Sequence, residues 1–135
     1  SVELEKRGIK EKVKFVTDLS GEEIAELYAI STIAVSPSVY EGFGFPAGEA
    51  MSCGIPLVAT NGGSLPEVVG DAGIIVQHSN PRSLVNALKD LLNSPEKQKE
   101  LSYKGRERVL ERFTWKRAAK ELVEVYKEAI INANS

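Results

Sequence analysis

Two carboxylates, Glu41 and Glu49, flank seven uncharged residues that include three glycines and one proline. The apolar run at residues 32–38 precedes them and predicts a short buried strand that leads into a loop. Residues 47–53 predict a helix with Pro46 in its first turn. With a strand, loop and helix in this order, backbone N–H groups point at one spot outside the strand end. Such a spot suits an anion, usually phosphate.

The two glutamates need a different partner, because an anion held by backbone N–H groups needs no carboxylate beside it. A carboxylate is a strong acceptor for hydroxyl groups. Glu41 lies in the loop before the amides, and Glu49 lies about one turn into the predicted helix. A ligand with phosphates in the middle and hydroxyl-rich rings at both ends, such as a nucleotide-sugar, fits this arrangement. The alternative is a tight turn with two solvated glutamates.

A longer stretch around these glutamates carries a family resemblance. Its three parts read PSVYEGFGFP (37–46), EAMSCGIPLVA (49–59) and GGSLPEVV (62–69). This stretch resembles the donor-site signature of retaining GT-B glycosyltransferases of the glycosyl transferases group 1 type. The resemblance extends over roughly residues 13–126, since FTW (113–115) and the helix predicted after it are similar to the family's C-terminal tail.

The resemblance implies a role for each matching residue. In the family, the glutamate at the Glu41 position contacts the transferred sugar, and the glutamate at the Glu49 position accepts hydrogen bonds from the ribose hydroxyls. Loop amides contact sugar hydroxyls and the diphosphate, and the base lies near a strand end that matches residues 15–17. The resemblance therefore implies Glu41 as the catalytic residue. It implies the following donor-binding residues: Gly42, Phe43, Gly44, Phe45, Glu49 and Thr17.

The resemblance also implies a reaction, the transfer of a sugar from a nucleotide-diphosphate sugar to an acceptor with retention of configuration. The main catalytic demand is then stabilisation of the leaving diphosphate, and neither glutamate needs to transfer a proton. No cofactor and no metal ion are expected, and the acceptor, a sugar or a lipid, stays undefined. Two alternatives remain open: a sugar-nucleotide epimerase of similar fold, and a non-catalytic interaction module that retained the motif.

The composition of the 135 residues, 42% hydrophobic and 27% charged, is that of one soluble globular domain. A net charge of −2 gives no electrostatic footprint for nucleic acid. The single cysteine, Cys53, excludes an internal disulfide and favours a cytoplasmic location, with peripheral membrane attachment of the full-length protein left open. Cys53 is expected in the core. One histidine, His78, without clustered ligands argues against a metal site.

Alternating patterns predict an α/β fold, a Rossmann-like parallel sheet with helices on both faces and a C-terminal helical tail, which the resemblance makes part of a GT-B fold. The four predicted strands are residues 13–17, 33–35, 56–60 and 73–76. Loops at their carboxyl ends are expected to gather on one edge, where ligands bind in such sheets. Capping boxes predict helix starts at Ser20 and Ser64. An apolar stripe in the tail predicts core or interface, and comprises Trp115, Ala118, Ala119, Leu122, Tyr126, Ala129 and Ile130.

The chain is expected to be a single, truncated C-terminal donor-binding domain, residues 1–135, of a two-domain enzyme. It has no initiating methionine, and residues 4–8 are typical of a helix end. Nothing before Val13 matches the acceptor-binding N-terminal domain or the arginine and lysine that neutralise the diphosphate in the family. Gly48 stands where a larger aliphatic residue is common. The chain alone is therefore expected to lack turnover, and self-association through uncovered apolar surface is expected.

Overall fold

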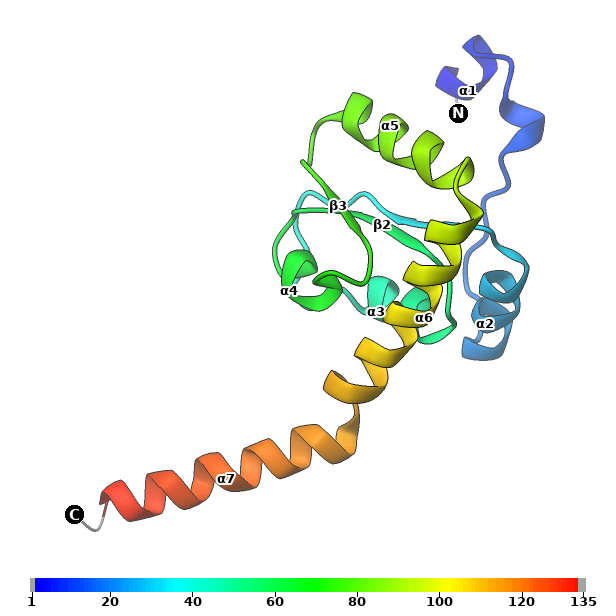
Figure 1. Cartoon of the computed structure of the whole chain (residues 1–135). Coiled ribbons are helices and arrows are strands. Elements are labelled where there is room, and N and C mark those ends of the chain that lie inside the picture. Colours follow the sequence, from blue (N-terminus) through cyan, green and yellow to red (C-terminus); the bar gives the residue numbers. More distant parts are fainter. Residues whose placement is uncertain (1, 134–135) are drawn as a thin grey trace.

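The computed structural model of the protein describes residues 2–133. Three strands form one parallel sheet in the order β1-β2-β3 (Figure 1), with the bounds β1 (Ala34–Ser36), β2 (Leu57–Thr60) and β3 (Ile74–Val76). The helical elements of the described chain are α1 (Val2–Lys6), the 3-10 turn η1 (Lys10–Lys12), α2 (Gly21–Ile30), α3 (Phe45–Ser52), α4 (Leu65–Val69), α5 (Pro81–Leu92), α6 (Pro95–Arg112) and α7 (Trp115–Ala133).

The central strand is β2, and all of its residues are buried. It pairs in parallel with β1, where Val35 lies opposite Val58, and with β3, where Ala59 lies opposite Ile75. A parallel strand covered on both faces is expected to be almost continuously apolar, and residues 57–59 satisfy this condition. The predicted parallel sheet is therefore confirmed.

Helices cover both faces of this sheet. On one face, α3 and α4 bury a hydrophobic cluster that includes the strand residues Leu57 and Ala59. On the other face, α5 packs over a cluster that includes Val58. The long helix α6 joins the two faces, since Leu101 belongs to the second cluster and Val109 packs against the first. The predicted Rossmann-like arrangement is confirmed.

The segment 13–17, predicted as a first strand, has no regular secondary structure. Its apolar residues lie at the surface, and the Phe15 side chain is 74% exposed. A strand needs a neighbour for its backbone hydrogen bonds. Within residues 2–133, however, the sheet contains β1, β2 and β3 alone. The prediction of a strand at residues 13–17 is therefore wrong.

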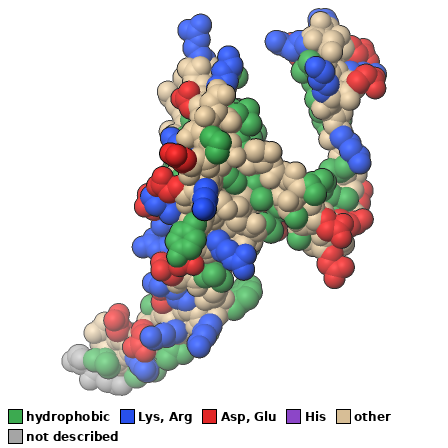
Figure 2. Space-filling view, turned by 45° about the vertical axis from the view of Figure 1, so that its right-hand side comes forward, with side chains coloured by type: hydrophobic (Ala, Val, Ile, Leu, Met, Phe, Trp, Pro, Cys, Tyr) green, Lys and Arg blue, Asp and Glu red, His purple; other side chains and the backbone are tan. Residues whose placement is uncertain are grey.

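The last helix, α7, projects away from the body of the molecule (Figure 1). None of its described residues is buried, and the Trp115 side chain is 91% exposed. Figure 2 shows hydrophobic side chains along this projecting helix. The stripe, predicted to lie in the core or at an interface, therefore does not lie in the core, because the bend between α6 and α7 carries it away from the sheet. Its role at an interface stays a prediction. Among residues 2–133, no helix is both long enough and apolar enough to span a bilayer.

Candidate functional site

The predicted order of strand, loop and helix is confirmed for the Gly-rich segment, which we define as residues 41–49. β1 ends at Ser36, and α3 begins at Phe45, two residues before the predicted start. Gly44 is the N-cap of α3 and has φ +82°, a left-handed conformation that favours glycine. Pro46 lies in the first turn, as predicted.

Gly44 packs closely against α4. A Cβ atom added to Gly44 would lie 3.0 Å from Cδ2 of Leu65, a side chain that is fully buried. A larger residue at this position would meet both backbone strain and a packed neighbour. The start of α3 therefore depends on glycine at position 44 for two separate reasons.

The loop after β2 packs directly on the loop after β1. A Cβ on Gly62 would lie 2.4 Å from the Ser38 carbonyl oxygen, and a Cβ on Gly63 would lie 2.2 Å from the Glu41 carbonyl oxygen. The Ser64 amide and hydroxyl both donate to this Glu41 oxygen, at 3.0 Å and 3.2 Å. Contacts this close require glycine, so the two glycines do more than turn the chain.

The side chain of Glu41 is half-buried and held in place by a neighbour. Its Oε1 atom accepts a hydrogen bond from the Ser38 hydroxyl at 2.8 Å. A carboxylate has about four acceptor positions, so this bond leaves capacity for a ligand hydroxyl. The sequence pattern predicts a helix cap at Ser64, but it predicts no contact of Ser38 or Ser64 with Glu41. The Ser38–Glu41 hydrogen bond joins residues three positions apart, so the sequence spacing could have suggested it. The Ser64–Glu41 contact joins two separate loops and depends on how they pack.

The second carboxylate, Glu49, is exposed on α3. It lines a hollow of about 200 Å³ between α2 and α3, together with Gly21, Ile24, Ala25, Tyr28, Ser52 and Cys53. The Tyr28 hydroxyl donates to the Pro46 carbonyl oxygen at 3.2 Å, which ties α2 to the first turn of α3. Burial raises the pKa of Tyr28, and the negative charge of Glu49 raises it further. Tyr28 therefore stays a neutral hydrogen-bond donor at physiological pH.

Two sequence-based predictions near the Gly-rich segment are wrong. Cys53 is exposed rather than in the core, because it is the C-cap of α3 and lies beyond the helix face that buries Ala50 and Met51. The helix start predicted at Ser64 is confirmed, since Ser64 is the N-cap of α4. The capping box predicted there is wrong, because the Ser64 hydroxyl donates to the Glu41 carbonyl oxygen instead. The capping box predicted at Ser20 is confirmed.

Two aromatic rings of the Gly-rich segment contact each other. Phe43 and Phe45 are 45% and 68% exposed, and their ring centroids lie 4.9 Å apart. Phe43 also makes an edge-to-face contact with Phe113, the C-cap of α6, at 5.8 Å and an interplanar angle of 89°. The Phe43 ring thus has one partner within the segment and one from the far end of α6.

The structure keeps together the predicted residues that lie between the end of β1 and the start of α3, which are Glu41, Gly42, Phe43, Gly44 and Phe45. Glu49 follows on the helix that they open. Thr17 differs, because it is exposed in the irregular segment 13–17 and no strand carries it to the edge of the sheet. Its contact with a base stays a prediction.

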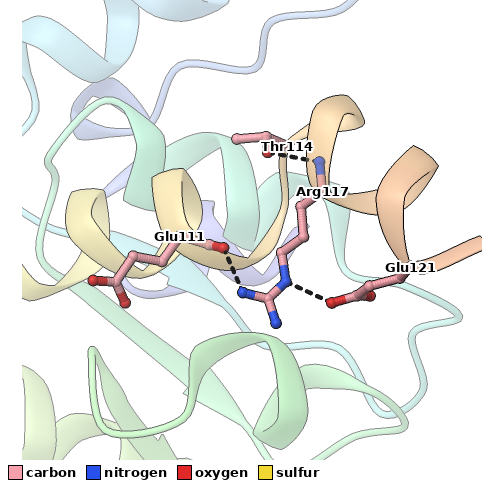
Figure 3. Close-up of polar contacts among 4 residues, drawn as sticks. All are labelled: Glu111, Thr114, Arg117 and Glu121. Atoms are coloured by element: carbon pink, nitrogen blue, oxygen red, sulfur yellow. Dashed lines mark hydrogen bonds and ion pairs between the residues drawn. The ribbon is translucent and has the colours of Figure 1, made fainter. Parts of the chain in front are cut away.

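Hollows also lie outside the Gly-rich segment. One, of about 220 Å³, lies at the carboxyl edge of the sheet beside Pro37 and Thr60. Another, of about 630 Å³, is open and lies in the bend between α6 and α7, where Arg117 donates to the Glu111 carbonyl oxygen and pairs with Glu121 (Figure 3). We do not take this hollow as the donor site on its volume alone, because the Arg117 guanidinium that lines it is already paired with Glu121. Within residues 2–133, no group of three or more His, Cys, Asp or Glu side chains could hold a metal ion.

Comparison with known proteins identifies a family. The model of the family "Glycosyl transferases group 1" matches residues 1–108. An MMP alpha-(1->4)-mannosyltransferase from Mycolicibacterium hassiacum is 43% identical over 91% of this chain and 31% of that protein. A D-inositol 3-phosphate glycosyltransferase from Rhodococcus erythropolis is 34% identical over 95% of this chain and 29% of that protein. The chain thus spans about a third of the length of these relatives.

Solved structures show the same fold. Sucrose-phosphate synthase from Thermosynechococcus elongatus matches with a TM-score of 0.85 at 30% identity, over 97% of this chain and 33% of that chain. Anabaena HepE in complex with UDP-glucose matches with a TM-score of 0.84 at 22% identity, over 94% of this chain and 35% of that chain. The expected relation to the GT-B fold is confirmed. On the match of its sequence over residues 1–108, the chain belongs to the glycosyl transferases group 1 family.

Proposed function

We propose that this chain is the donor-binding part of a retaining glycosyltransferase, which transfers a sugar from a nucleotide-diphosphate sugar to an acceptor. One observation carries the proposal. Gly44 opens α3 directly after the loop that holds Glu41, so a helix start and an anchored carboxylate lie at the same edge of the sheet. Family membership supports the reaction class.

In this proposal, the start of α3 binds the diphosphate. The first N–H groups of a helix have no partner within the helix, and they carry a partial positive charge. We assign the amides of Phe43, Gly44 and Phe45 to the diphosphate and adjacent sugar hydroxyls, with Gly42 allowing close approach of the backbone. These amides stabilise the charge that develops on the leaving diphosphate, so the reaction needs no metal ion.

The two glutamates bind the two ends of the donor. Glu41, held by Ser38, accepts a hydrogen bond from the transferred sugar and orients its reacting carbon. Glu49, exposed on α3, accepts from the ribose hydroxyls. Thr17 contacts the base. In a retaining reaction the acceptor oxygen joins the sugar carbon on the face from which the diphosphate leaves, so the donor must stay fixed through the exchange.

The acceptor site belongs, in this proposal, to a further part of a longer protein. The chain spans 31% of the mannosyltransferase and 33% of the sucrose-phosphate synthase chain. About two thirds of each relative therefore lies beyond the matched region, which is enough for at least one further domain. We assign the acceptor and the cationic side chains near the diphosphate to that region. The HepE complex with UDP-glucose supports a nucleotide-sugar as the donor class.

Calorimetric titration with UDP-glucose, GDP-mannose, ADP-glucose and the three parent diphosphates tests the proposal. We expect one nucleotide series to bind, and to bind equally in the presence of EDTA. Product analysis with the longer protein then distinguishes sugar transfer from epimerisation of the donor. Absence of binding to every nucleotide, or an epimerised donor as product, would contradict the proposal.

A further inference from the structure

Phe43 lies between two glycines, Gly42 and Gly44, and carries the one side chain of this tripeptide that can pack against a neighbour. Glycine restricts the backbone less than any other residue, so a Gly-Phe-Gly sequence loses much conformational freedom when it becomes ordered. A defined position for the amides of Phe43 and Gly44 therefore needs an anchor. The Phe43 side chain is 45% exposed, so burial in the core supplies only part of this anchor.

The second part of the anchor comes from the far end of α6. Phe113 is half-buried and presents its ring edge-to-face to Phe43, with centroids 5.8 Å apart. Edge-to-face contact is a favoured geometry for aromatic pairs and stabilises them beyond the area that they bury. The neighbouring Phe45 ring, 4.9 Å from Phe43, belongs to the same segment and moves with it. Phe113 is therefore the aromatic partner that the Phe43 ring has outside the Gly-rich segment.

The position of Phe113 is itself fixed by the bend between α6 and α7. Its amide donates to the Val109 carbonyl oxygen at 2.9 Å. Beyond it, the Arg117 amide bonds to the Thr114 hydroxyl at 3.3 Å, and the Arg117 guanidinium reaches back to the Glu111 carbonyl oxygen at 2.9 Å (Figure 3). These bonds join the last turn of α6 to the first turn of α7 on both sides of Phe113.

We propose that Phe113 is a positioning residue for the Gly-rich segment, acting through the Phe43 ring. It holds the amides of residues 43–45 in the conformation that receives the diphosphate. The inference rests on the proposed function for its ligand, but not for the contact between the two rings. It makes the α6–α7 bend part of the donor site, although no residue of either helix is assigned a contact with the donor.

Backbone order parameters from ¹⁵N relaxation of the ligand-free protein test the contact. In Phe113→Ala, the amides of residues 42–45 are expected to fall from the rigid value of about 0.85 to below about 0.6. Trp115→Ala is the matched control, because Trp115 is an aromatic residue of the same bend, is 91% exposed and takes no part in the contact with Phe43. Unchanged order parameters in Phe113→Ala would overturn the proposal. Phe113→Leu serves if the alanine variant does not fold.

Affinity for UDP, GDP and ADP tests the consequence. For whichever of these binds the unsubstituted protein most tightly, Phe113→Leu is expected to raise Kd about three- to tenfold, and Phe113→Tyr by less than about twofold. Phe43→Leu is expected to raise Kd little further in the Phe113→Leu background, because the contact between the two rings is already lost there. Additive effects would overturn the proposal. If none of the three diphosphates binds, the proposed function fails, while the order parameters still decide the role of Phe113.

Discussion

The carbonyl oxygen of Glu41 accepts two hydrogen bonds from Ser64, one from its amide at 3.0 Å and one from its hydroxyl at 3.2 Å. Glu41 follows β1 and Ser64 follows β2, so these bonds join the two loops that leave the carboxyl edge of neighbouring strands. Gly63 makes the approach possible, since a Cβ there would lie 2.2 Å from the same oxygen. The position of Glu41 therefore depends on the loop after β2, which carries Gly63 and Ser64.

Gly63→Ala is expected to destabilise the protein by about 2 kcal/mol or more, because the methyl group would displace Glu41 and the backbone at φ +59° disfavours a side chain. Gly42→Ala is the matched control, since its Cβ would meet nothing within 4 Å and its φ is not positive. It is expected to change stability by less than about 0.5 kcal/mol. Urea unfolding of both variants measures the difference. Equal stabilities would show that the loops separate without cost.

The parallel sheet and the order of strand, Gly-rich segment and α3 could be predicted from the sequence. The reason is that each feature is local: apolar runs mark the strands, and Pro46 marks the first turn of α3. The capping box at Ser20 is equally local, and it is confirmed. For the site, the sequence pattern was sufficient to group Glu41 with the residues that open α3.

The failed predictions concern tertiary surroundings, which a local pattern does not contain. Residues 13–17 have apolar residues typical of a strand, but the described sheet offers them no neighbour. The periodicity of α7 marks an apolar face correctly, yet it does not say whether the helix turns toward the sheet, and Trp115 is 91% exposed. Ser64 lies at a helix start, as a capping residue would, but its hydroxyl donates to the Glu41 carbonyl oxygen instead. In each case the presence or absence of a distant partner decides the outcome.

Glu49→Ala is expected to weaken nucleoside diphosphate binding by about 1.5–3 kcal/mol, because a charge-assisted hydrogen bond to the ribose is lost. Glu49→Gln keeps an acceptor oxygen and is expected to cost less. Glu96→Ala, an exposed glutamate at the start of α6, is the control for a change in net charge. Isothermal titration calorimetry measures all three. An unchanged affinity in Glu49→Ala would show that the ribose contact is assigned to the wrong residue.

Gly48 lies within α3, and a Cβ there would meet nothing within 4 Å. Gly48→Ala is therefore expected to raise the free energy of unfolding by about 0.5–1 kcal/mol, because alanine is the better helix former. Gly105→Ala in α6 is expected to gain less, since its Cβ would lie 3.4 Å from Met51 of α3. Denaturant titrations compare the two. A destabilised Gly48→Ala would mean that this face of α3 is not open.

The exposed side chains of α7 lead to a prediction about association. Tyr126 and Ile130 are 60% and 62% exposed on the apolar stripe, and contiguous apolar surface favours contact with other molecules. The isolated chain is expected to self-associate at high concentration, and Tyr126→Lys to reduce this association. Asn132→Lys adds the same charge away from the stripe and is expected to leave it unchanged. Light scattering that shows a monomer for the unsubstituted chain would contradict the prediction.

The last prediction separates the sugar end of the donor from its diphosphate. In the longer protein, Glu41→Ala is expected to lower sugar transfer, and affinity for the nucleotide-sugar, while the bare nucleoside diphosphate binds nearly as before. Gly44→Val is expected to weaken both ligands, because a side chain at φ +82°, 3.0 Å from Leu65, displaces the first turn of α3 and its amides. Calorimetry with the two ligands, on the same preparations, gives the comparison.

Strain alone could lower affinity in Gly44→Val, so a control with similar backbone strain is needed. Gly54→Val provides it, because Gly54 follows the other end of α3 and has φ +72°. Thermal melting is expected to show lowered stability for both valine variants, but only Gly44→Val loses diphosphate affinity. If Gly54→Val loses it equally, the effect belongs to the fold and not to the helix start. If Glu41→Ala abolishes binding of the bare diphosphate, Glu41 and Glu49 have exchanged roles.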